Sequence, residues 1–330
     1  SGTAGGATGG GGGARPEPFT FFAIGDPRSN WDVFESNARS MVQLDPNTIA
    51  TFSIGDLTPV GAAGEWDDHH QALADGAPDP SVATDPSGIV RQSHFRTDVS
   101  TWGAYSWYLG ILGNHDDGDG NWFANWNDYL PGQQGLGVNA TDGIYYSLTY
   151  QNTLFIALDS VNGSSEQTTW LEGVLTSTEG SAATWKLAFF HRPVYPCNGK
   201  SPFDNGLDWV TLFEQHGVDI VFVADSHTYE RTCPMVGGVC AANGVIYLNT
   251  SGGGAGVRDV DATRVDTLSD GGRTDTYDCA AILQSYQGNW HHFSHITVDG
   301  CLLTLRAYGH DWDQTQAAPF DELVIDKCAD

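Results

Sequence analysis

Residues 19–28 read FTFFAIGDPR and decide the fold of this chain. Six consecutive apolar or β-forming residues end in a Gly-Asp turn, which is the pattern of a buried strand that carries a polar side chain, Asp26, at its end. A second buried run, Thr48–Ile54, ends in the same way at Gly55 and Asp56. A strand that ends in a carboxylate is one of the parts that a two-metal hydrolase needs.

Three further strand-like runs also end in side chains that bind metal ions. Carboxylate, amide and imidazole groups are the ligands with which a two-metal hydrolase holds two cations, which then clamp a phosphoryl group and generate hydroxide. Each residue alone is equally compatible with an Asx turn or a packed histidine, so the interpretation depends on the whole set. The further motifs are Asn114, His115 and Asp116 after Tyr108–Leu112, His191 after Trp185–Phe190, and Asp225 and His227 after Val218–Val223.

Helical and strand-like segments alternate from Phe19 onward, and the chain closes in antiparallel β structure. Mixed βαβ units followed by a β meander predict an α/β fold of mixed α+β character. We expect a four-layer αββα sandwich of two mixed sheets with helices outside. Besides the runs above, the predicted helices are Trp31–Val42, Glu65–Ala74 and Gln167–Leu175, and the predicted strands are Ile144–Tyr150, Thr153–Leu158, Val245–Leu248, His292–Val298, Leu302–Tyr308 and Glu322–Ile325.

The chain of 330 residues is strongly acidic, with a formal net charge of -27 and lysine only at Lys186, Lys200 and Lys327. Such a surface repels phosphate backbones and argues against nucleic acid or an anionic membrane as a partner. No apolar run reaches roughly 20 residues, so we expect neither a signal peptide nor a membrane span in this sequence.

Residues 1–18 consist almost entirely of Gly, Ala, Ser, Thr and Pro. This composition predicts a flexible tether rather than part of a core. The tether resembles a stalk left after removal of a secretion or lipoprotein signal, which suggests a lipid or cell-surface attachment. It could also dock onto a neighbouring subunit and form a homo-oligomer.

The six cysteines form an even set without Cys-x-x-Cys spacing. Disulfides at this density favour an oxidising setting, so we expect a secreted, periplasmic or cell-surface protein. Six buried thiols are the alternative. The expected pairs are Cys233 with Cys240 across a short turn, Cys301 with Cys328 on two C-terminal strands, and Cys197 with Cys279 as the remaining pair.

These motifs resemble those of the calcineurin-like metallophosphoesterase superfamily, and most closely its purple-acid-phosphatase-like members. The resemblance extends over about Phe19–Tyr308 and implies that residues 19–330 form one metallophosphoesterase-like domain. It assigns Asp56 as the carboxylate that bridges two metal ions. It further implies Asp26 and His227 as ligands of the first metal, Asn114, His191 and Asp225 as ligands of the second, and His115 as a general acid whose ring Asp116 orients.

The chain departs from the family pattern at three positions. Arg28 stands where many members have a metal-binding His, and Pro59 stands where the purple acid phosphatases have a Tyr. Arg28 cannot bind a cation, because a guanidinium offers no lone pair. It could bind the substrate phosphate, or it could replace the charge of the first metal beside Asp26 and Asp56. Asp225 stands where the family usually has a His, and an Asp can still bind a metal.

The ligand set therefore predicts one or two divalent metal ions. Three oxygens and one nitrogen at the second site favour Mn, Mg or Ca, while Zn or Fe remains compatible with the site as a whole. We expect a secreted metal-dependent phosphoesterase that hydrolyses a phosphorylated small molecule, preferably a monoester, with a metal-activated hydroxide. The alternative is a non-catalytic member of the fold with a reduced metal site, used for binding or self-assembly through its N-terminal tail.

Two further acidic segments could have a functional role, but a structural role is the favoured interpretation for each of them. The segment Asp67-Asp68-His69-His70 is predicted to form a solvated helix face, although it could line the mouth of the site. Asp117–Asn121 alternates like a calcium loop but has Trp122 where such a loop needs Gly.

Overall fold

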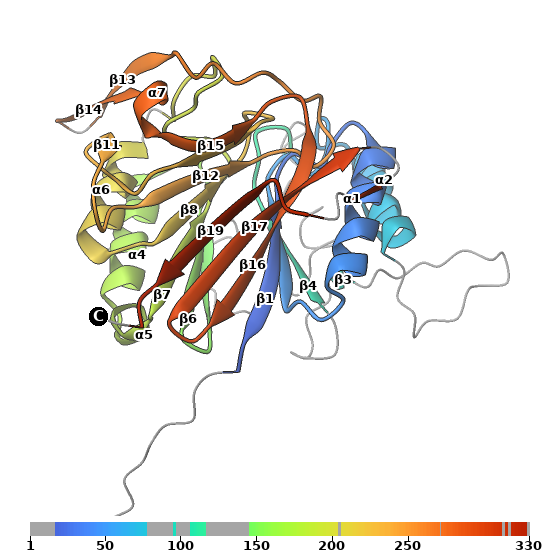
Figure 1. The fold of residues 1–330 in the computed structure, drawn as a ribbon, viewed down its shortest axis with the longest axis horizontal. Coiled ribbons are helices and arrows are strands. Elements are labelled where there is room, and N and C mark those ends of the chain that lie inside the picture. The colour runs from blue at the N-terminus through green and yellow to red at the C-terminus, as the bar shows by residue number, and fades with distance from the viewer. Residues whose placement is uncertain are drawn as a thin grey trace, which may run out of the picture.

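The computed structural model describes residues 17–77, 95–96, 106–116, 145–203, 206–270, 272–311, 314–315 and 318–328. Two mixed β-sheets face each other, and helices cover the outer face of each sheet (Figure 1). This arrangement confirms the predicted sandwich. Within the described residues, no helix is both long enough and apolar enough to cross a membrane.

The first sheet has eight strands, of which four are parallel and belong to the N-terminal part of the chain. Helices α1 (Trp31–Leu44) and α2 (Ala63–Gly76) follow the first two of these strands and pack side by side outside the sheet (Figure 1). The C-terminal strands are antiparallel. The order is β18 (Gln314–Thr315), β17 (Leu302–Asp311), β16 (His291–Asp299), β1 (Phe19–Ile24), β2 (Ala50–Ile54), β4 (Ser106–Ile111) and β3 (Phe95–Arg96), and β19 (Asp321–Asp326) pairs with β17.

The second sheet has seven strands, and its four central strands are parallel. Helices α4 (Ser165–Thr176), α5 (Thr178–Ala182) and α6 (Gly206–His216) belong to its outer layer (Figure 1). The predicted hairpin at its edge is confirmed. The order is β15 (Leu283–Gln287), β9 (Tyr229–Thr232), β12 (Ile246–Thr250), β8 (Ile220–Val223), β7 (Trp185–Phe189), β6 (Thr153–Ala157) and β5 (Tyr146–Tyr150).

Some elements were not anticipated from the sequence. Helix α6 and strands β9 and β15 are the larger ones, and a peripheral region adds two small hairpins and one short helix. These are β10 (Met235–Val236) with β11 (Val239–Cys240), β13 (Val265–Asp270) with β14 (Arg273–Asp278), and α7 (Cys279–Ile282).

The core has three layers because strand residues alternate between the two faces of each sheet. On β1, Phe21 points into the core between the sheets, whereas Phe22 points toward the core beneath α1 and α2. Aromatic rings dominate the layer between the sheets, where Phe52, Phe189 and Phe222 stack in a row with centroid distances of 4.2 and 4.7 Å. This packing fixes the two sheets against each other and so holds their strand ends in place.

All six cysteines are paired, and the pairs are those expected from the sequence. The alternative of six buried thiols is therefore wrong. The pair Cys197 and Cys279 has a sequence separation of 82 residues and ties the segment after β7 to α7. Three disulfides in one chain are typical of an oxidising compartment.

The prediction of a solvated face at residues 67–70 is wrong for His69. Asp67 and Asp68 are exposed, but His69 is completely buried. Its ring stacks on Phe34 of α1, and its Nε2 atom lies 3.1 Å from the hydroxyl oxygen of Tyr108. His69 is therefore a core residue between α2 and the first sheet.

Candidate metal centre

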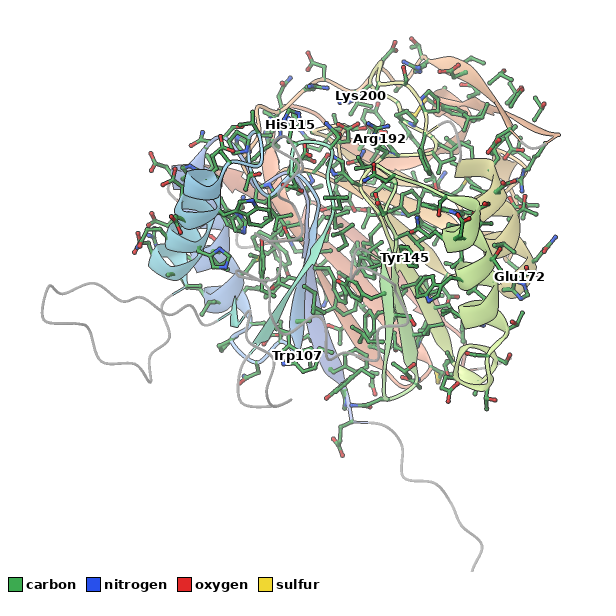
Figure 2. The ribbon with its side chains drawn as sticks, turned by 180° about the vertical axis from the view of Figure 1, so that it is seen from behind. Trp107, His115, Tyr145, Glu172, Arg192 and Lys200 are labelled. Atoms are coloured by element: carbon green, nitrogen blue, oxygen red, sulfur yellow. A yellow bond between two sulfur atoms is a disulfide. The ribbon has the colours of Figure 1, made fainter. Side chains whose placement is uncertain are left out.

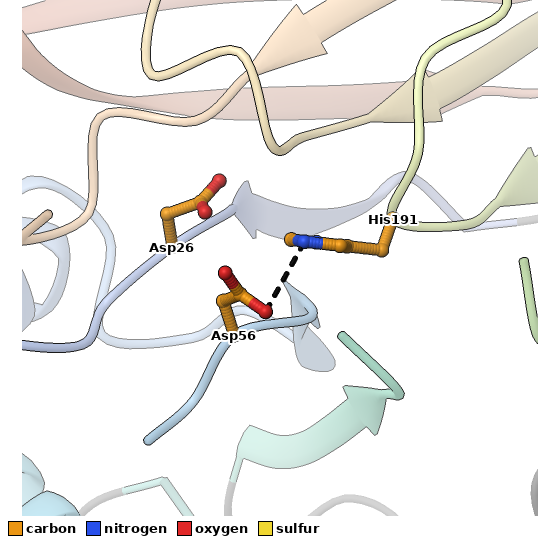
Figure 3. Close-up of side chains that lie close together, drawn as sticks. All are labelled: Asp26, Asp56 and His191. Carbon is orange, nitrogen blue, oxygen red and sulfur yellow. Dashed lines mark ion pairs between the residues drawn. The ribbon is translucent and has the colours of Figure 1, made fainter. Parts of the chain in front are cut away.

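The predicted ligands come together where the parallel strands of both sheets end. Asp26 follows β1, Asp56 follows β2, and His191 follows β7 of the other sheet (Figure 3). One ligand atom of each residue lies within 4.8 Å of the others, and all three residues are buried. Carboxylate oxygens and an imidazole nitrogen in this arrangement fit a divalent cation.

Four of the predicted ligands have a left-handed backbone conformation. The φ angles are 54° at Asp26, 54° at Asp56, 63° at Asp225 and 59° at His227. Residues other than glycine rarely adopt such angles, and each instance costs about 1–3 kcal/mol. The surrounding structure must therefore hold the backbone at these four positions.

Two glycines of the motifs are required because other groups approach them closely. A Cβ atom at Gly55 would lie 2.5 Å from Nδ1 of His191, and the φ angle there is +77°. A Cβ atom at Gly113 would lie 2.0 Å from the backbone nitrogen of Asp56. The Gly-Asp and Gly-Asn-His motifs thus bring three loops into direct contact.

Each of the two ligand histidines has a fixed orientation. His191 has its Nδ1 2.8 Å from the carbonyl oxygen of Ile54, and His227 has its Nδ1 2.8 Å from that of Gly256. A carbonyl can only accept a hydrogen bond, so Nδ1 carries the proton in both rings and Nε2 is available as a ligand. Nε2 of His191 lies 3.2 Å from Asp56 Oδ1, and Nε2 of His227 lies 3.2 Å from Asp26 Oδ1.

Three of these atoms are buried without a hydrogen-bond partner among the described residues: Asp26 Oδ1, His191 Nε2 and His227 Nε2. Buried polar atoms normally have a partner, because an unsatisfied group costs about 1–3 kcal/mol. Each Nε2 lies 3.2 Å from a carboxylate oxygen, and in the neutral ring its lone pair and that oxygen could both bind a cation. These unsatisfied atoms show that the residues fit a metal ion.

The pKa values of the buried groups show how strongly this pocket favours positive charge. Burial alone would lower the pKa of His191, but the Asp56 carboxylate outweighs it, and the pKa rises to about 10, so a cation would have to displace a proton from Nε2. Burial alone would raise the pKa of Asp56, but His191 and Arg28 hold it well below its usual range. Burial and the neighbouring Asp56 raise the pKa of Asp116 to about 8.

Arg28 lies directly on the predicted bridging carboxylate. Its Nε atom donates a hydrogen bond of 2.9 Å to Asp56 Oδ2, and its side chain is only 15% exposed. The other oxygen of Asp56 accepts a hydrogen bond of 2.9 Å from the backbone of His115. This contact lets the charge of Arg28 compensate Asp56, and because it uses Nε alone it is also compatible with phosphate binding by the terminal nitrogens.

Lys200 is a site residue that the sequence analysis missed. Its ammonium group lies 2.5 Å from Asp225 Oδ1, while His191 Nε2 lies 3.9 Å from the same oxygen. The backbone nitrogen of Asp225 donates a hydrogen bond of 2.9 Å to Asp26 Oδ2. The only signal in the sequence was that the chain has three lysines, which makes each of them a rare source of positive charge.

The expected pairing of His115 with Asp116 is not present. Nδ1 of His115 lies 2.5 Å from the carbonyl oxygen of Pro59, and its Nε2 lies 3.9 Å from Asp56 Oδ2. The buried carboxylate of Asp116 instead accepts hydrogen bonds from the backbone nitrogens of Thr58 and Gly113. Asp116 therefore supports the loops after β2 and β4, and a carbonyl orients His115.

Asn114 lines a polar cavity of about 420 Å³ together with Asp225, Arg192 and Lys200. Figure 2 shows His115, Arg192 and Lys200 gathered at the same end of the sandwich. The possible calcium loop Asp117–Asn121 lies outside the described residues.

Known proteins resemble this chain in both sequence and fold. The chain is 26% identical over 260 residues to probable inactive purple acid phosphatase 1 of Arabidopsis thaliana, covering 71% of this chain and 40% of that protein. It is 25% identical over 182 residues to phosphoenolpyruvate phosphatase of Allium cepa, covering 53% of this chain and 34% of that protein. The fold matches purple acid phosphatase PPD1 of yellow lupin (Lupinus luteus) with a TM-score of 0.62 at 18% identity, covering 94% of this chain and 54% of that structure.

The chain thus spans 40% or less of the length of these two curated relatives. A family model described as calcineurin-like phosphoesterase matches residues 20–229, which is more than half of the chain. The match includes the ends of β1, β2, β4, β7 and β8, where the candidate ligands lie. The chain therefore belongs to the calcineurin-like phosphoesterase family, with purple acid phosphatases among its distant relatives.

Proposed function

We propose that this protein is a metal-dependent phosphatase that hydrolyses phosphate monoesters of small molecules. The observation that carries the proposal is the cluster of Asp26, Asp56 and His191, whose ligand atoms converge in a buried site and include unsatisfied ones. The family supports the reaction class, and the relatives named as phosphatases support the preference for monoesters.

In this proposal Asp56 would help to hold one cation, or both if two are bound. Asp26 and His227 would hold the first, and Asn114, His191 and Asp225 the second. A bound divalent cation supplies Lewis acidity toward the phosphoryl oxygens and lowers the pKa of water. The oxygen-rich second set favours Mn, Mg or Ca, and Zn or Fe remains compatible with the site.

The protein supplies the positioning and the proton transfer. His115 is 35% exposed, and its ring is fixed through Nδ1, so Nε2 is the atom that would give a proton to the departing alcohol oxygen. Among the described residues Arg28 contacts Asp56 through Nε and Ser29 at 3.4 Å through one terminal nitrogen, so its terminal nitrogens would be available for the phosphate oxygens. The raised pKa of Asp116 favours its protonated form, which adds no second negative charge beside Asp56.

The test compares the wild-type protein with Asp56→Asn, after purification without chelators and loading with manganese. We expect one or two metal ions per wild-type chain by elemental analysis, and hydrolysis of p-nitrophenyl phosphate. The variant should lose metal and about 10²-fold or more in kcat, because it loses a shared ligand. The exposed Asp68→Asn is the matched control and should retain both properties. A wild-type chain that binds no metal and hydrolyses no ester would overturn the proposal.

The proposal includes a location outside the cytoplasm, in a secreted, periplasmic or cell-surface setting. The three disulfides support it, since such bonds persist in oxidising compartments. Residues 1–18 would then serve as a tether ahead of a catalytic domain in residues 19–330.

A second candidate is a non-catalytic protein that keeps this fold for binding or self-assembly through residues 1–18. Two contacts favour it: Arg28 already neutralises Asp56, and Lys200 already neutralises Asp225. The test is sedimentation over a range of concentrations, with and without residues 1–18. Assembly of the full chain that disappears on deletion, together with absence of phosphatase activity, would support this candidate over the first.

A further inference from the structure

The cavity beside the metal centre contains an arginine that the proposed chemistry does not use. The cavity has a volume of about 420 Å³, which lies within the range of small-molecule sites. Asn114 and Asp225 form the wall that it shares with the metal centre, and Arg192 and Lys200 also line it. A molecule held by its phosphate at the metal centre can therefore extend into this cavity.

Arg192 follows His191 directly in the chain, and a hydrogen bond from its backbone nitrogen fixes its position. Its backbone nitrogen donates a hydrogen bond of 2.9 Å to Ser160 Oγ, and its side chain is half-buried. Its guanidinium forms neither a hydrogen bond nor an ion pair with any residue in the described ranges. Six other described arginines do pair with carboxylates, namely Arg28, Arg39, Arg231, Arg264, Arg273 and Arg306.

An unpaired, half-buried guanidinium stands out in a chain with a net charge of -27. Arginine is seldom buried without an anionic partner, because its charge loses hydration. Although the described residues contain many carboxylates, none of those carboxylates pairs with Arg192, and this leaves its guanidinium available for an anion from solution. The planar guanidinium matches a carboxylate with two parallel hydrogen bonds.

The charges of the residues that line the cavity indicate the charge of the anion that it would bind. Arg192 and Lys200 contribute two positive charges, and Asp225, which pairs with Lys200, contributes one negative charge. Among the described lining residues one positive charge remains, which matches a carboxylate better than a doubly charged phosphate. Pro202 and Phe203 supply an apolar wall for a short carbon skeleton.

We infer that Arg192 and Lys200 form a second anion subsite, and that the preferred substrates are small phosphate monoesters that carry a carboxylate on the alcohol part. The inference rests on the proposed function, because the metal centre must hold the phosphate. Arg192 is then a specificity-determining residue that binds the carboxylate directly, and Lys200 adds its two remaining donors.

The experiment measures binding of two non-hydrolysable probes to the manganese-loaded protein by titration calorimetry. Phosphonoacetate carries a carboxylate as its second anionic group. The probe 2-hydroxyethylphosphonate has a similar size, but its second group is an uncharged hydroxyl. We expect the wild-type protein to bind phosphonoacetate about tenfold more tightly, since charge-assisted hydrogen bonds are the stronger ones. Arg192→Gln should remove this preference and leave the affinity for 2-hydroxyethylphosphonate unchanged. Arg306→Gln, on β17 and paired with Glu322, is the control and should keep the preference.

Several results would overturn the subsite. Equal affinity of the wild-type protein for both probes would overturn it. If Arg192→Gln lowers the affinity for both probes by the same factor, Arg192 binds the phosphoryl group, and the subsite is again overturned. Binding of neither probe would overturn the subsite and the proposed phosphate site together. If the wild-type protein prefers phosphonoacetate but hydrolyses no ester, the subsite is supported and only the proposed phosphatase activity is refuted. Equal urea midpoints of the variants confirm that they are folded.

Discussion

At the scale of single residues, the backbone and not the side-chain composition sets the geometry of the metal centre. Asp26 and Asp56 have φ angles of 54°, and the His191 and His227 rings are fixed by hydrogen bonds between Nδ1 and carbonyl oxygens. These features would pre-orient the candidate ligand atoms for a cation, so that little reorganisation would accompany its binding. The cost is local backbone strain and unsatisfied polar atoms, and a bound cation would satisfy those atoms.

The first prediction at this scale concerns Gly113. Its replacement by Ala places a Cβ atom 2.0 Å from the backbone nitrogen of Asp56 and 2.4 Å from its Oδ1, so the two loops must separate. We expect a loss of about 1–3 kcal/mol in the free energy of unfolding, as for other overpacked sites, and a loss of bound metal. Urea denaturation and elemental analysis measure the two effects.

Gly173 provides the matched control for that substitution. It is an exposed residue of α4, and a Cβ atom there meets nothing within 4 Å. Gly173→Ala should therefore stabilise the protein by up to about 1 kcal/mol through helix propensity and leave the metal content unchanged. Equal effects of the two substitutions would show that the contact between Gly113 and Asp56 is not tight.

At the scale of secondary-structure elements, the site depends on links that hold strands and helices in register. One such link lies at the opposite end of β1 from Asp26. Asp45, the C-cap of α1, accepts hydrogen bonds from the Thr20 hydroxyl at 2.6 Å and pairs with Nε2 of His295 on β16 at 3.0 Å. The carboxylate thus joins one helix to two strands of the first sheet.

This link predicts a specific loss of stability in acid. Burial would raise the pKa of Asp45, but the hydrogen bonds from His295, Thr20 and Asn47 outweigh it and lower the pKa from 3.8 to about 2. Because the folded pKa lies below the ordinary value, the contribution is present above about pH 4 and is lost as pH falls toward 2. The urea midpoint of the wild-type protein should therefore fall more steeply than that of Asp45→Asn over this range.

Asp68→Asn is the control for this measurement, because Asp68 is exposed on α2. This variant should follow the wild-type protein across the whole range. If Asp45→Asn also follows the wild-type profile, the link between α1, β1 and β16 contributes nothing to acid stability.

At the scale of the whole molecule, the charge opposes folding while the three-layered core supports it. A net charge of -27 on a compact domain creates repulsion that dissolved salt screens. The screening length falls from about 30 Å at about 0.01 M ionic strength to about 8 Å at about 0.15 M. We therefore expect the urea midpoint to rise over this range of salt concentration at neutral pH.

The identity of the salt separates screening from specific binding. Sodium, potassium and tetramethylammonium chloride should give the same rise if screening is responsible, because tetramethylammonium is too large for the metal centre. A rise with sodium alone would point to a bound cation. A midpoint that does not change with any salt would contradict the repulsion argument.

The sequence by itself determined the elements whose signals are local. Strands such as Phe19–Ile24 and Ala50–Ile54 follow from short apolar runs that end in Gly-Asp, and the layered fold follows from their alternation with helices. The positions of Asp26 and Asp56 at strand ends follow from the same runs. The pairing of six cysteines followed from their spacing and place along the chain.

Tertiary structure alone decided which groups meet at the site. The contact of Lys200 with Asp225 and the position of Arg192 in the cavity depend on how separate loops pack, and no local pattern encodes them. The same reason explains the buried His69 and the role of Asp116, whose partners lie on other elements. Local periodicity reports which face of an element is buried, whereas the partner of a polar side chain is set by long-range packing.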